Sequence, residues 1–543
     1  MSRHDDDGLR TLLVGLDGAC LPVVDPLIDD GRLPVLADLL ERGASGPLES
    51  QIPPWTPSAW PSLYTGTNPG SHGAFDFLTF DGYDWDVVNR SHVREHAIWE
   101  LLSEHDRTSV VVNVPVTAPP PAFDGALVPG YVGPESPPTH PEGLIEDLRE
   151  ELGEYRVYAP RGVEGDEQIE WYRRLTRMRG AAFRHLADRF DPEFGFLQFQ
   201  QTDTVFHERP EDDEAVNAVY ETVDEELGAV LDACDPETVF VVSDHGIGPY
   251  RDEEFRVNEF LRERGFVATT RGEGGMPSWG ALGPENLGED GGEGDDDRSL
   301  AERAVATAAA HGLTSQRIEA ILSRLGLADL ALKLVSTDTV RAGTERVDFE
   351  RSTAYMRSRT ELGIRINLAG REPNGTVSPA EYPSVRDDVV DELASARTPD
   401  GDPVFSEVGP REEFFEGEYI DDAADIIAVP DEFDTFLTAS LRGDLFGPTS
   451  ETWNHKRDGL VAAVGAGVDA DGSVEGAHLF DVAPTVLSAL GVPPSDRMDG
   501  GPLPVVDPVP PDEYPPYVAT GTRRTDDDDV EQRLADLGYL DDS

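Results

Sequence analysis

The chain has 543 residues, is 38% hydrophobic, and carries 44 basic against 107 acidic side chains, which gives a formal net charge of −63. Two cysteines cannot make a disulfide framework, and a surface this acidic disfavours duplex nucleic acid, which needs basic groups to neutralise its phosphates. Lysine occurs only at Lys333 and Lys456, a pattern typical of proteins from a salt-saturated cytoplasm, where ions screen self-repulsion.

The N-terminal segment lacks the apolar stretch of a signal peptide, and no run approaches the roughly 20 apolar residues that span a bilayer. We therefore expect a cytoplasmic protein without a membrane span, from a halophilic, haloarchaeal source. No pattern in the chain predicts its oligomeric state.

Apolar β-rich runs alternate with helical patterns, which predicts an α/β fold with a mainly parallel central sheet and helices on both faces. A helix is expected over residues 26–41 with Asp25 as its N-cap, and another over residues 481–490. The strands are expected at residues 11–16, 109–114, 194–199, 238–243 and 460–464.

Two stretches depart from this alternation. Residues 269–298 are rich in Gly, Asp and Glu, and residues 299–342 have helical apolar spacing, so 269–342 is interpreted as an acidic loop and helical insertion or cap. Residues 516–543 look like an acidic tail that ends in a short amphipathic helix. The main domain is then discontinuous, with parts at 1–268 and 343–515.

Polar residues with ligand chemistry follow the first strands. Asp17-Gly18 comes directly after residues 11–16, at the carboxyl edge of the sheet where ligands bind in open α/β folds, although Asp-Gly turns are common. Thr56-Pro57 has the form of an N-cap before a helix. A hydroxyl there meets the positive end of the helix dipole, which favours a phosphoryl group as well as a plain cap.

Later strands are followed by carboxylates and imidazoles. Asp203 and His207 are spaced i, i+4, which brings both to one side of a helical turn and suits chelation as well as a surface pair. Asp244-His245 follows a very apolar strand, where polar groups are costly unless they are paired or ligated. His455 stands just before the last strand and alone carries no signal.

The order of these motifs resembles the alkaline phosphatase superfamily and, within it, the type I phosphodiesterase and nucleotide pyrophosphatase group. The resemblance extends from Leu12 to Leu503. It is carried by Asp17-Gly18, Thr56 ahead of Ser62–Gly66 and His72-Gly73, Asp203 with His207, Asp244-His245-Gly246, His455, Phe480–Gly491 and Met498–Gly500.

The resemblance implies an alkaline phosphatase-like fold and a hydrolase for a small-molecule phosphoester, with Thr56 as the nucleophile and a phosphothreonine intermediate. It also implies two divalent metal ions, for which we expect Zn²⁺, with Mn²⁺ as the alternative. The implied ligands are Asp203, His207 and His455 for one ion, and Asp17, Asp244, His245 and the Thr56 oxygen for the other.

One position departs from the group. Nucleotide pyrophosphatases usually carry an asparagine where this chain has Phe77, so a nucleotide substrate is not implied. Residues 347–355 and 367–375 instead resemble a prokaryotic branch of phosphohydrolases or phosphomutases of open substrate. The alternatives are a phosphomutase or phosphotransferase of the cofactor-independent phosphoglycerate mutase type and a non-catalytic binding protein. Sulfatase chemistry is disfavoured because Cys20-Leu-Pro22 is followed by Val23-Val24.

Overall fold

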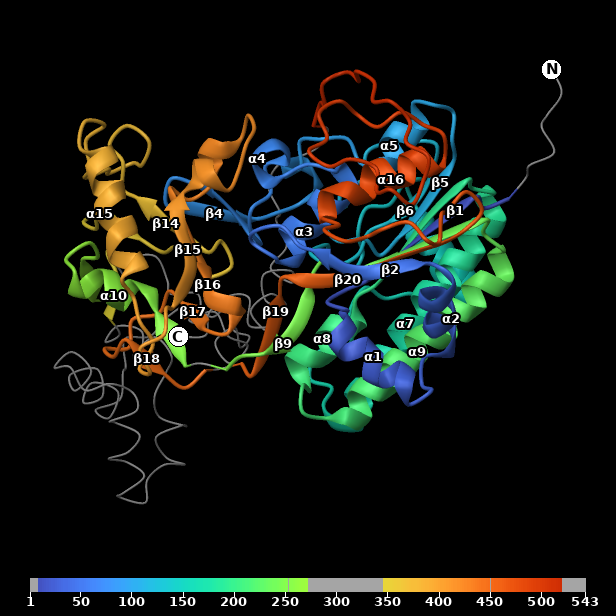
Figure 1. The fold of residues 1–543 in the computed structure, drawn as a ribbon, viewed down its shortest axis with the longest axis horizontal. Helices are drawn as coiled ribbons and strands as arrows, with labels where there is room; N and C mark the ends of the chain where they lie inside the picture. Colours follow the sequence, from blue (N-terminus) through green and yellow to red (C-terminus); the bar gives the residue numbers. More distant parts are fainter. Residues whose placement is uncertain (1–7, 252, 272–344, 450, 520–543) are drawn as a thin grey trace, which may run out of the picture.

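The structure is a computed structural model and describes residues 8–251, 253–271, 345–449 and 451–519 (Figure 1). The predicted insertion at 269–342 and the predicted tail at 516–543 lie almost wholly outside these residues. Their boundaries therefore stay predictions.

A seven-stranded sheet forms the centre of the part of the chain that the structure describes. Its order is β2 (Ala44–Glu49), β20 (Asp458–Gly465), β8 (Thr238–Val242), β1 (Thr11–Leu16), β7 (Phe194–Phe199), β5 (Ser109–Val112) and β6 (Gly125–Val128). The five strands from β8 to β6 are parallel, whereas β20 is antiparallel to both of its neighbours. The predicted mainly parallel sheet is confirmed, with one reversed strand that the pattern did not predict.

Both faces of the sheet are buried, because successive side chains of a strand point to opposite sides. Leu13 belongs to one hydrophobic core, and Leu12 and Val14 belong to the other. One face is covered by α1 (Leu21–Asp29), α2 (Pro34–Arg42), α6 (Leu144–Leu152), α7 (Gly165–Phe190), α8 (Gln201–Glu208) and α9 (Asp213–Cys234). The opposite face is covered by α3 (Thr56–Thr65), α5 (Ile98–Ser103) and α16 (Val482–Ala489).

The helix expected over residues 26–41 is wrong. The chain forms two helices there, because α1 starts at Leu21 after the N-cap Cys20 and the chain turns at Gly31, whose φ is 72°, before α2 begins at Pro34. The helix expected over residues 481–490 is confirmed as α16, which follows the 3₁₀ turn η7 (Leu479–Asp481).

Residues on both sides of the predicted insertion build a second group of small sheets beside the central one (Figure 1). Its elements are β10 (Glu254–Arg256), α10 (Val257–Glu263), β11 (Thr269–Arg271), β12 (Glu345–Val347), β13 (Ala354–Tyr355), β14 (Gly363–Ile366), α15 (Tyr382–Ala394), β15 (Phe405–Pro410), η4 (Arg411–Glu413), η5 (Ile420–Asp422), β16 (Ile426–Pro430), η6 (Asp431–Phe433), β17 (Phe436–Thr438) and β18 (Phe446–Gly447). Its apolar residues continue the core beneath α3 and α16.

Shorter elements complete the arrangement. The antiparallel pair β9 (Gly246–Pro249) and β19 (Trp453–Lys456) lies between the two sheet regions (Figure 1). The others are α4 (Pro69–His72), the hairpin β3 (Leu78–Asp81) and β4 (Asp84–Val87), and η1 (Arg90–His92). Among the described helices, none combines the length and apolar character needed to cross a bilayer.

Candidate active site

The carboxyl ends of three neighbouring parallel strands bring acidic residues together. Asp17 follows β1, Asp244 follows β8, and Asp203 lies in α8 directly after β7. His455 reaches the same place from β19, where it pairs in register with Ile247 of β9. Thr56 begins α3, beyond the end of β2. Segments that are far apart in sequence thus meet at one edge of the sheet, as expected for open α/β folds.

The tight turn after β1 depends on glycine. Gly18 has a φ of 64°, a left-handed conformation that residues with a side chain rarely adopt. A Cβ atom at this position would also lie 3.0 Å from the Oδ1 of Asp203. The Gly18 amide donates a hydrogen bond of 3.3 Å to Oδ1 of Asp244, which ties the loops after β1 and β8 together.

Among the described residues, one group of potential metal ligands comprises Asp17, Asp244 and His245, all fully buried. The Nε2 atom of His245 lies 3.2 Å from Oδ2 of Asp244 and 3.5 Å from Oδ1 of Asp17. The Ser50 hydroxyl donates a 2.7 Å hydrogen bond to the Asp244 backbone carbonyl and anchors this loop. Two carboxylates and an imidazole therefore point at one small volume.

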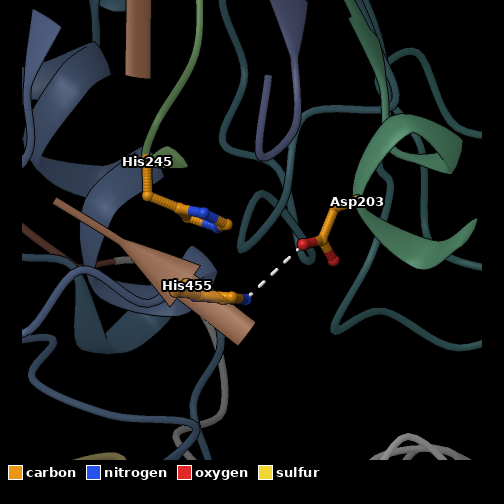
Figure 2. Close-up of side chains that lie close together, drawn as sticks. All are labelled: Asp203, His245 and His455. Atoms are coloured by element: carbon orange, nitrogen blue, oxygen red, sulfur yellow. Dashed lines mark ion pairs between the residues drawn. The ribbon is translucent and has the colours of Figure 1, made fainter. Parts of the chain in front are cut away.

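A second set of ligand atoms lies beside the first. The Nε2 atom of His207 is 3.3 Å from Oδ1 of Asp203 and 3.2 Å from Nε2 of His455, and that atom of His455 is 3.6 Å from the same Asp203 oxygen. Figure 2 shows the rings of His245 and His455 lying one above the other, with Asp203 facing them from α8; the ring centroids are 3.6 Å apart. His245 thus lies between the two sets, and its donor atom is also within 4.8 Å of those of Asp203 and His455.

Burial and mutual repulsion make the negative charges of the clustered carboxylates unfavourable, so a bound cation would stabilise them. Burial raises the pKa of Asp17 well above its usual value, and the carboxylates of Asp244 and Asp203 raise it further. Burial raises the pKa of Asp244 to about 6, against the opposing effect of His245. Burial lowers the pKa of His455 well below its ordinary value, and neighbouring imidazoles add to this; for His207 burial lowers the pKa, but the Asp203 carboxylate outweighs it.

The residues present fit divalent cations. Nδ1 of His245 lies 2.9 Å from the Gly246 carbonyl, and Nδ1 of His455 lies 2.9 Å from the Pro54 carbonyl. Because a carbonyl only accepts, each Nδ1 carries the proton and each Nε2 turns a lone pair toward the cluster. Oδ2 of Asp244 is buried without a hydrogen-bond partner, which is costly unless a cation neutralises it. Carboxylates and imidazoles without thiolates suit zinc or manganese.

Thr56 is placed one residue differently from the expected N-cap. Trp55 occupies the N-cap position, and Thr56 is the first residue of α3, with Pro57 next. Its Oγ1 atom lies 3.5 Å from Oδ1 of Asp17 and 3.4 Å from Nε2 of His245. The hydroxyl therefore faces the acidic and imidazole side chains.

Four side chains that contact the ligands were not identified in the sequence. Trp60 and Gln198 donate hydrogen bonds to the carboxylate of Asp17, and the hydroxyls of Thr202 and Ser50 bond the backbone carbonyls of Asp17 and Asp244. Only Gln198 could have been recognised from the sequence. Gln198 is a polar residue inside the otherwise apolar strand β7, where a buried amide needs a partner.

His72 of the His72-Gly73 motif and Phe77 are both fully buried. Nδ1 of His72 accepts a hydrogen bond from the Ala74 amide, so its Nε2 donates to the Ser62 hydroxyl at 2.9 Å. Burial lowers the pKa of His72 to about 3, which keeps this imidazole neutral. The Phe77 ring is fully buried and packs edge-on against Tyr131, with ring centroids 6.2 Å apart.

Asp76 is a buried acid outside the ligand cluster. Its Oδ1 atom accepts hydrogen bonds from the Thr360 hydroxyl and the Phe77 amide, while Oδ2 has no hydrogen-bond partner. Burial raises the pKa of Asp76 to about 6, and the Glu361 carboxylate adds to the shift. Since the unfolded chain releases this proton near pH 4, the folded state binds it more tightly between about pH 4 and pH 6.

An Asp76→Asn variant should therefore change the pH dependence of stability. Asp76 alone costs the native state about 3 kcal/mol as pH rises through that window. Relative to wild type, the unfolding free energy of Asp76→Asn should rise by a similar amount from pH 4 to pH 7, measured by denaturant titration in molar salt. Any effect of the introduced amide on stability that does not depend on pH cancels when the change from pH 4 to pH 7 is compared between the two proteins. Parallel curves for the two proteins would contradict the prediction.

The sequence and the fold are similar to those of known proteins. A family model described as type I phosphodiesterase / nucleotide pyrophosphatase matches residues 11–319. The fold is similar to phosphonoacetate hydrolase from Sinorhizobium meliloti 1021 in complex with phosphonoformate, at 17% identity and a TM-score of 0.52, over 89% of this chain and 96% of that one.

The fold is also similar to wild-type alkaline phosphatase PafA, at 13% identity and a TM-score of 0.51, over 93% of this chain and 100% of that one. At such low identities these two likenesses establish the fold alone, which is alkaline phosphatase-like. No curated protein sequence gives a significant match.

Proposed function

Because the chain belongs to the type I phosphodiesterase / nucleotide pyrophosphatase family of the alkaline phosphatase superfamily, we propose that this hydrolase cleaves a small-molecule phosphoester with Thr56 as its nucleophile. The position of the Thr56 hydroxyl carries the proposal, since it lies 3.5 Å from Asp17 Oδ1 and 3.4 Å from His245 Nε2. It also stands in the first turn of α3, whose N-terminus favours negative charge on an attached phosphoryl group.

In the proposed reaction the Thr56 hydroxyl loses its proton to solvent as its oxygen bonds to phosphorus, and the ester oxygen leaves. Water then hydrolyses the phosphothreonine, which restores the Thr56 hydroxyl and releases phosphate or a phosphomonoester. When bound, two divalent cations would supply the positive charge that stabilises the attacking and leaving oxygens. The proposed ligands are Asp203, His207 and His455 for one cation, and Asp17, Asp244, His245 and the Thr56 oxygen for the other. Zinc is the proposed metal, with manganese as the alternative.

The substrate proposal stops at the phosphoester. Phe77 occupies the position where nucleotide pyrophosphatases usually have an asparagine, and its buried ring offers no polar atom to a phosphoryl oxygen. The proposal therefore does not extend to nucleotides. The salt-rich cytoplasm predicted from the net charge of −63 also stays a prediction, and it sets the assay conditions.

Zinc-loaded protein in molar KCl should hydrolyse bis-p-nitrophenyl phosphate, p-nitrophenyl phosphate, or both. The rate should exceed the uncatalysed reaction by more than about a millionfold. Release of nitrophenolate measures each rate, and the ratio of the two kcat/KM values assigns diester or monoester preference. Failure with both esters, combined with conversion of 3-phosphoglycerate to 2-phosphoglycerate without phosphate release, would replace the hydrolase by the mutase.

A further inference from the structure

The two carboxylate oxygens of Asp17 have different environments. Oδ2 accepts hydrogen bonds from the indole N–H of Trp60 at 3.1 Å and from the amide of Gln198 at 2.6 Å. Oδ1 instead faces Thr56 Oγ1 and His245 Nε2, each at 3.5 Å. All of these side chains are buried. Two N–H donors therefore occupy one oxygen and leave the other directed at the ligand cluster.

A further residue fixes the orientation of the Gln198 amide. Nδ2 of Asn113 donates to Oε1 of Gln198 at 2.6 Å and to the Gln198 backbone carbonyl at 3.2 Å. Because Oε1 is occupied by this donor, the NH₂ group of Gln198 is the end that meets Asp17. Asn113, at the end of β5, is thus linked through Gln198 to Asp17, at the end of β1.

A glycine in β1 makes room for both donors. Gly15 lies in β1, and Asp17 follows the last residue of this strand, so their spacing of two residues places them on the same face of the sheet. A Cβ atom on Gly15 would overlap Cη2 of Trp60 and would lie 3.2 Å from Cγ of Gln198. Because Gly15 has no side chain, the indole of Trp60 and the side chain of Gln198 can occupy the space above it and reach Asp17.

Helix α3 serves both oxygens of the same carboxylate. Trp60 follows Thr56 by four residues, a spacing that places both side chains on one face of the helix. Trp60 meets Oδ2 of Asp17, and the Thr56 hydroxyl lies beside Oδ1. The helix that carries the proposed nucleophile also orients a proposed metal ligand.

We propose that Trp60 and Gln198, seated over Gly15, are positioning residues that restrict Asp17 to binding its metal ion through Oδ1 alone. The inference rests on the proposed function, because it assigns Asp17 to a metal site. Two N–H donors hold the carboxylate plane, remove the rotation that would let both oxygens bind the ion, and so lower the cost of ordering the ligand. Loss of either donor should weaken one metal site and spare the other.

The test is the titration of metal-free protein with Zn²⁺ alone, in molar KCl, against a competing chromophoric chelator. Wild-type protein should bind two ions. Trp60→Phe and Gln198→Met should each weaken one of them by about 10- to 100-fold, the usual effect of losing a hydrogen bond to a metal ligand. The affinity for the other ion should stay within about twofold, and a thermal transition should show that each variant is folded.

Trp99→Phe is the matched control. The Trp99 ring packs 6.4 Å from Phe196 in the core, and the Trp60 ring packs 6.0 Å from it. The indole nitrogen of Trp99 is buried without a hydrogen-bond partner, so this variant removes the same atoms without removing a bond to a ligand. Both zinc affinities of Trp99→Phe should equal those of wild type.

Each outcome decides the inference. Zinc affinities equal to those of wild type in both Trp60→Phe and Gln198→Met would overturn the inference. The proposed function would still stand in that case if wild-type protein bound two zinc ions and hydrolysed the ester. Equal weakening in Trp60→Phe and Trp99→Phe would also overturn the inference, because packing would then explain the effect. Wild-type protein that bound no zinc would remove the metal site, and with it both proposals. If Trp60→Phe did not fold, the Gln198→Met affinities would decide alone.

Discussion

Thr56→Ala should lower the kcat of phosphoester hydrolysis by at least about a thousandfold, because water would have to replace an attacking oxygen that is already in place. Zinc should still bind, since Asp17, Asp244 and His245 remain. Steady-state assays with the better nitrophenyl ester give the turnover. Mass spectrometry of acid-quenched wild-type enzyme should find phosphothreonine at residue 56 after reaction with the monoester, or threonine bearing a nitrophenyl phosphate after reaction with the diester. Neither adduct should be found in Thr56→Ala.

Thr56→Ser is the matched control for this result. It keeps a hydroxyl at the start of α3, so it should retain activity far above that of the alanine variant and should be phosphorylated on the serine. Full activity in Thr56→Ala, with zinc bound, would identify water as the nucleophile and would refute the phosphothreonine step.

Removal of the divalent ions should abolish hydrolysis and lower stability together. Without them, Asp17, Asp203 and Asp244 are buried beside one another with no cation to offset their charges. Zinc at about a hundredfold above the dissociation constant of each site should raise the unfolding free energy by about 3 kcal/mol for each bound ion, relative to the metal-free protein. Calorimetry before and after chelation measures the change.

Restoration of the ions provides the control for metal removal. Addition of Zn²⁺ to the chelated protein should recover activity and thermal stability, and a parallel addition of Mn²⁺ compares the two candidate metals. Unaltered hydrolysis by protein whose metal content is shown to be nil by mass spectrometry would rule out the two-metal proposal.

The central strands were predictable because parallel strands covered on both faces form continuous apolar runs. Residues 11–16 and 194–199 have that character except at Thr11 and Gln198, and the structure places β1 and β7 there without a shift. The reversal of β20 left no local pattern, because strand direction depends on how the chain crosses the sheet. The single helix expected at 26–41 failed because apolar spacing continues through the turn at Gly31.

The candidate site was predictable as far as its chemistry restricts residue types. Carboxylates after strand ends pointed to a ligand cluster, whereas His455 was assigned only through the resemblance. The structure brings Asp17, Asp244 and His455 to one edge of the sheet. The contacts of Trp60 and Gln198 with Asp17 could not be predicted, because both side chains depend on the room that Gly15 of β1 leaves by lacking a side chain. A fit of this kind between residues far apart in the chain produces no recognisable spacing in a single sequence.

The place of β20 in the sheet bears on how the protein is made. β2 pairs with β20, and β20 also covers one edge of β8, so a nascent chain that ends before Asp458 leaves both strands with open hydrogen-bonding edges. His455 leaves the ribosome just ahead of β20. Closing the sheet and completing the ligand cluster are therefore one late event of biosynthesis, and an unfinished chain presents exposed strand edges to chaperones before all of the proposed metal ligands are present.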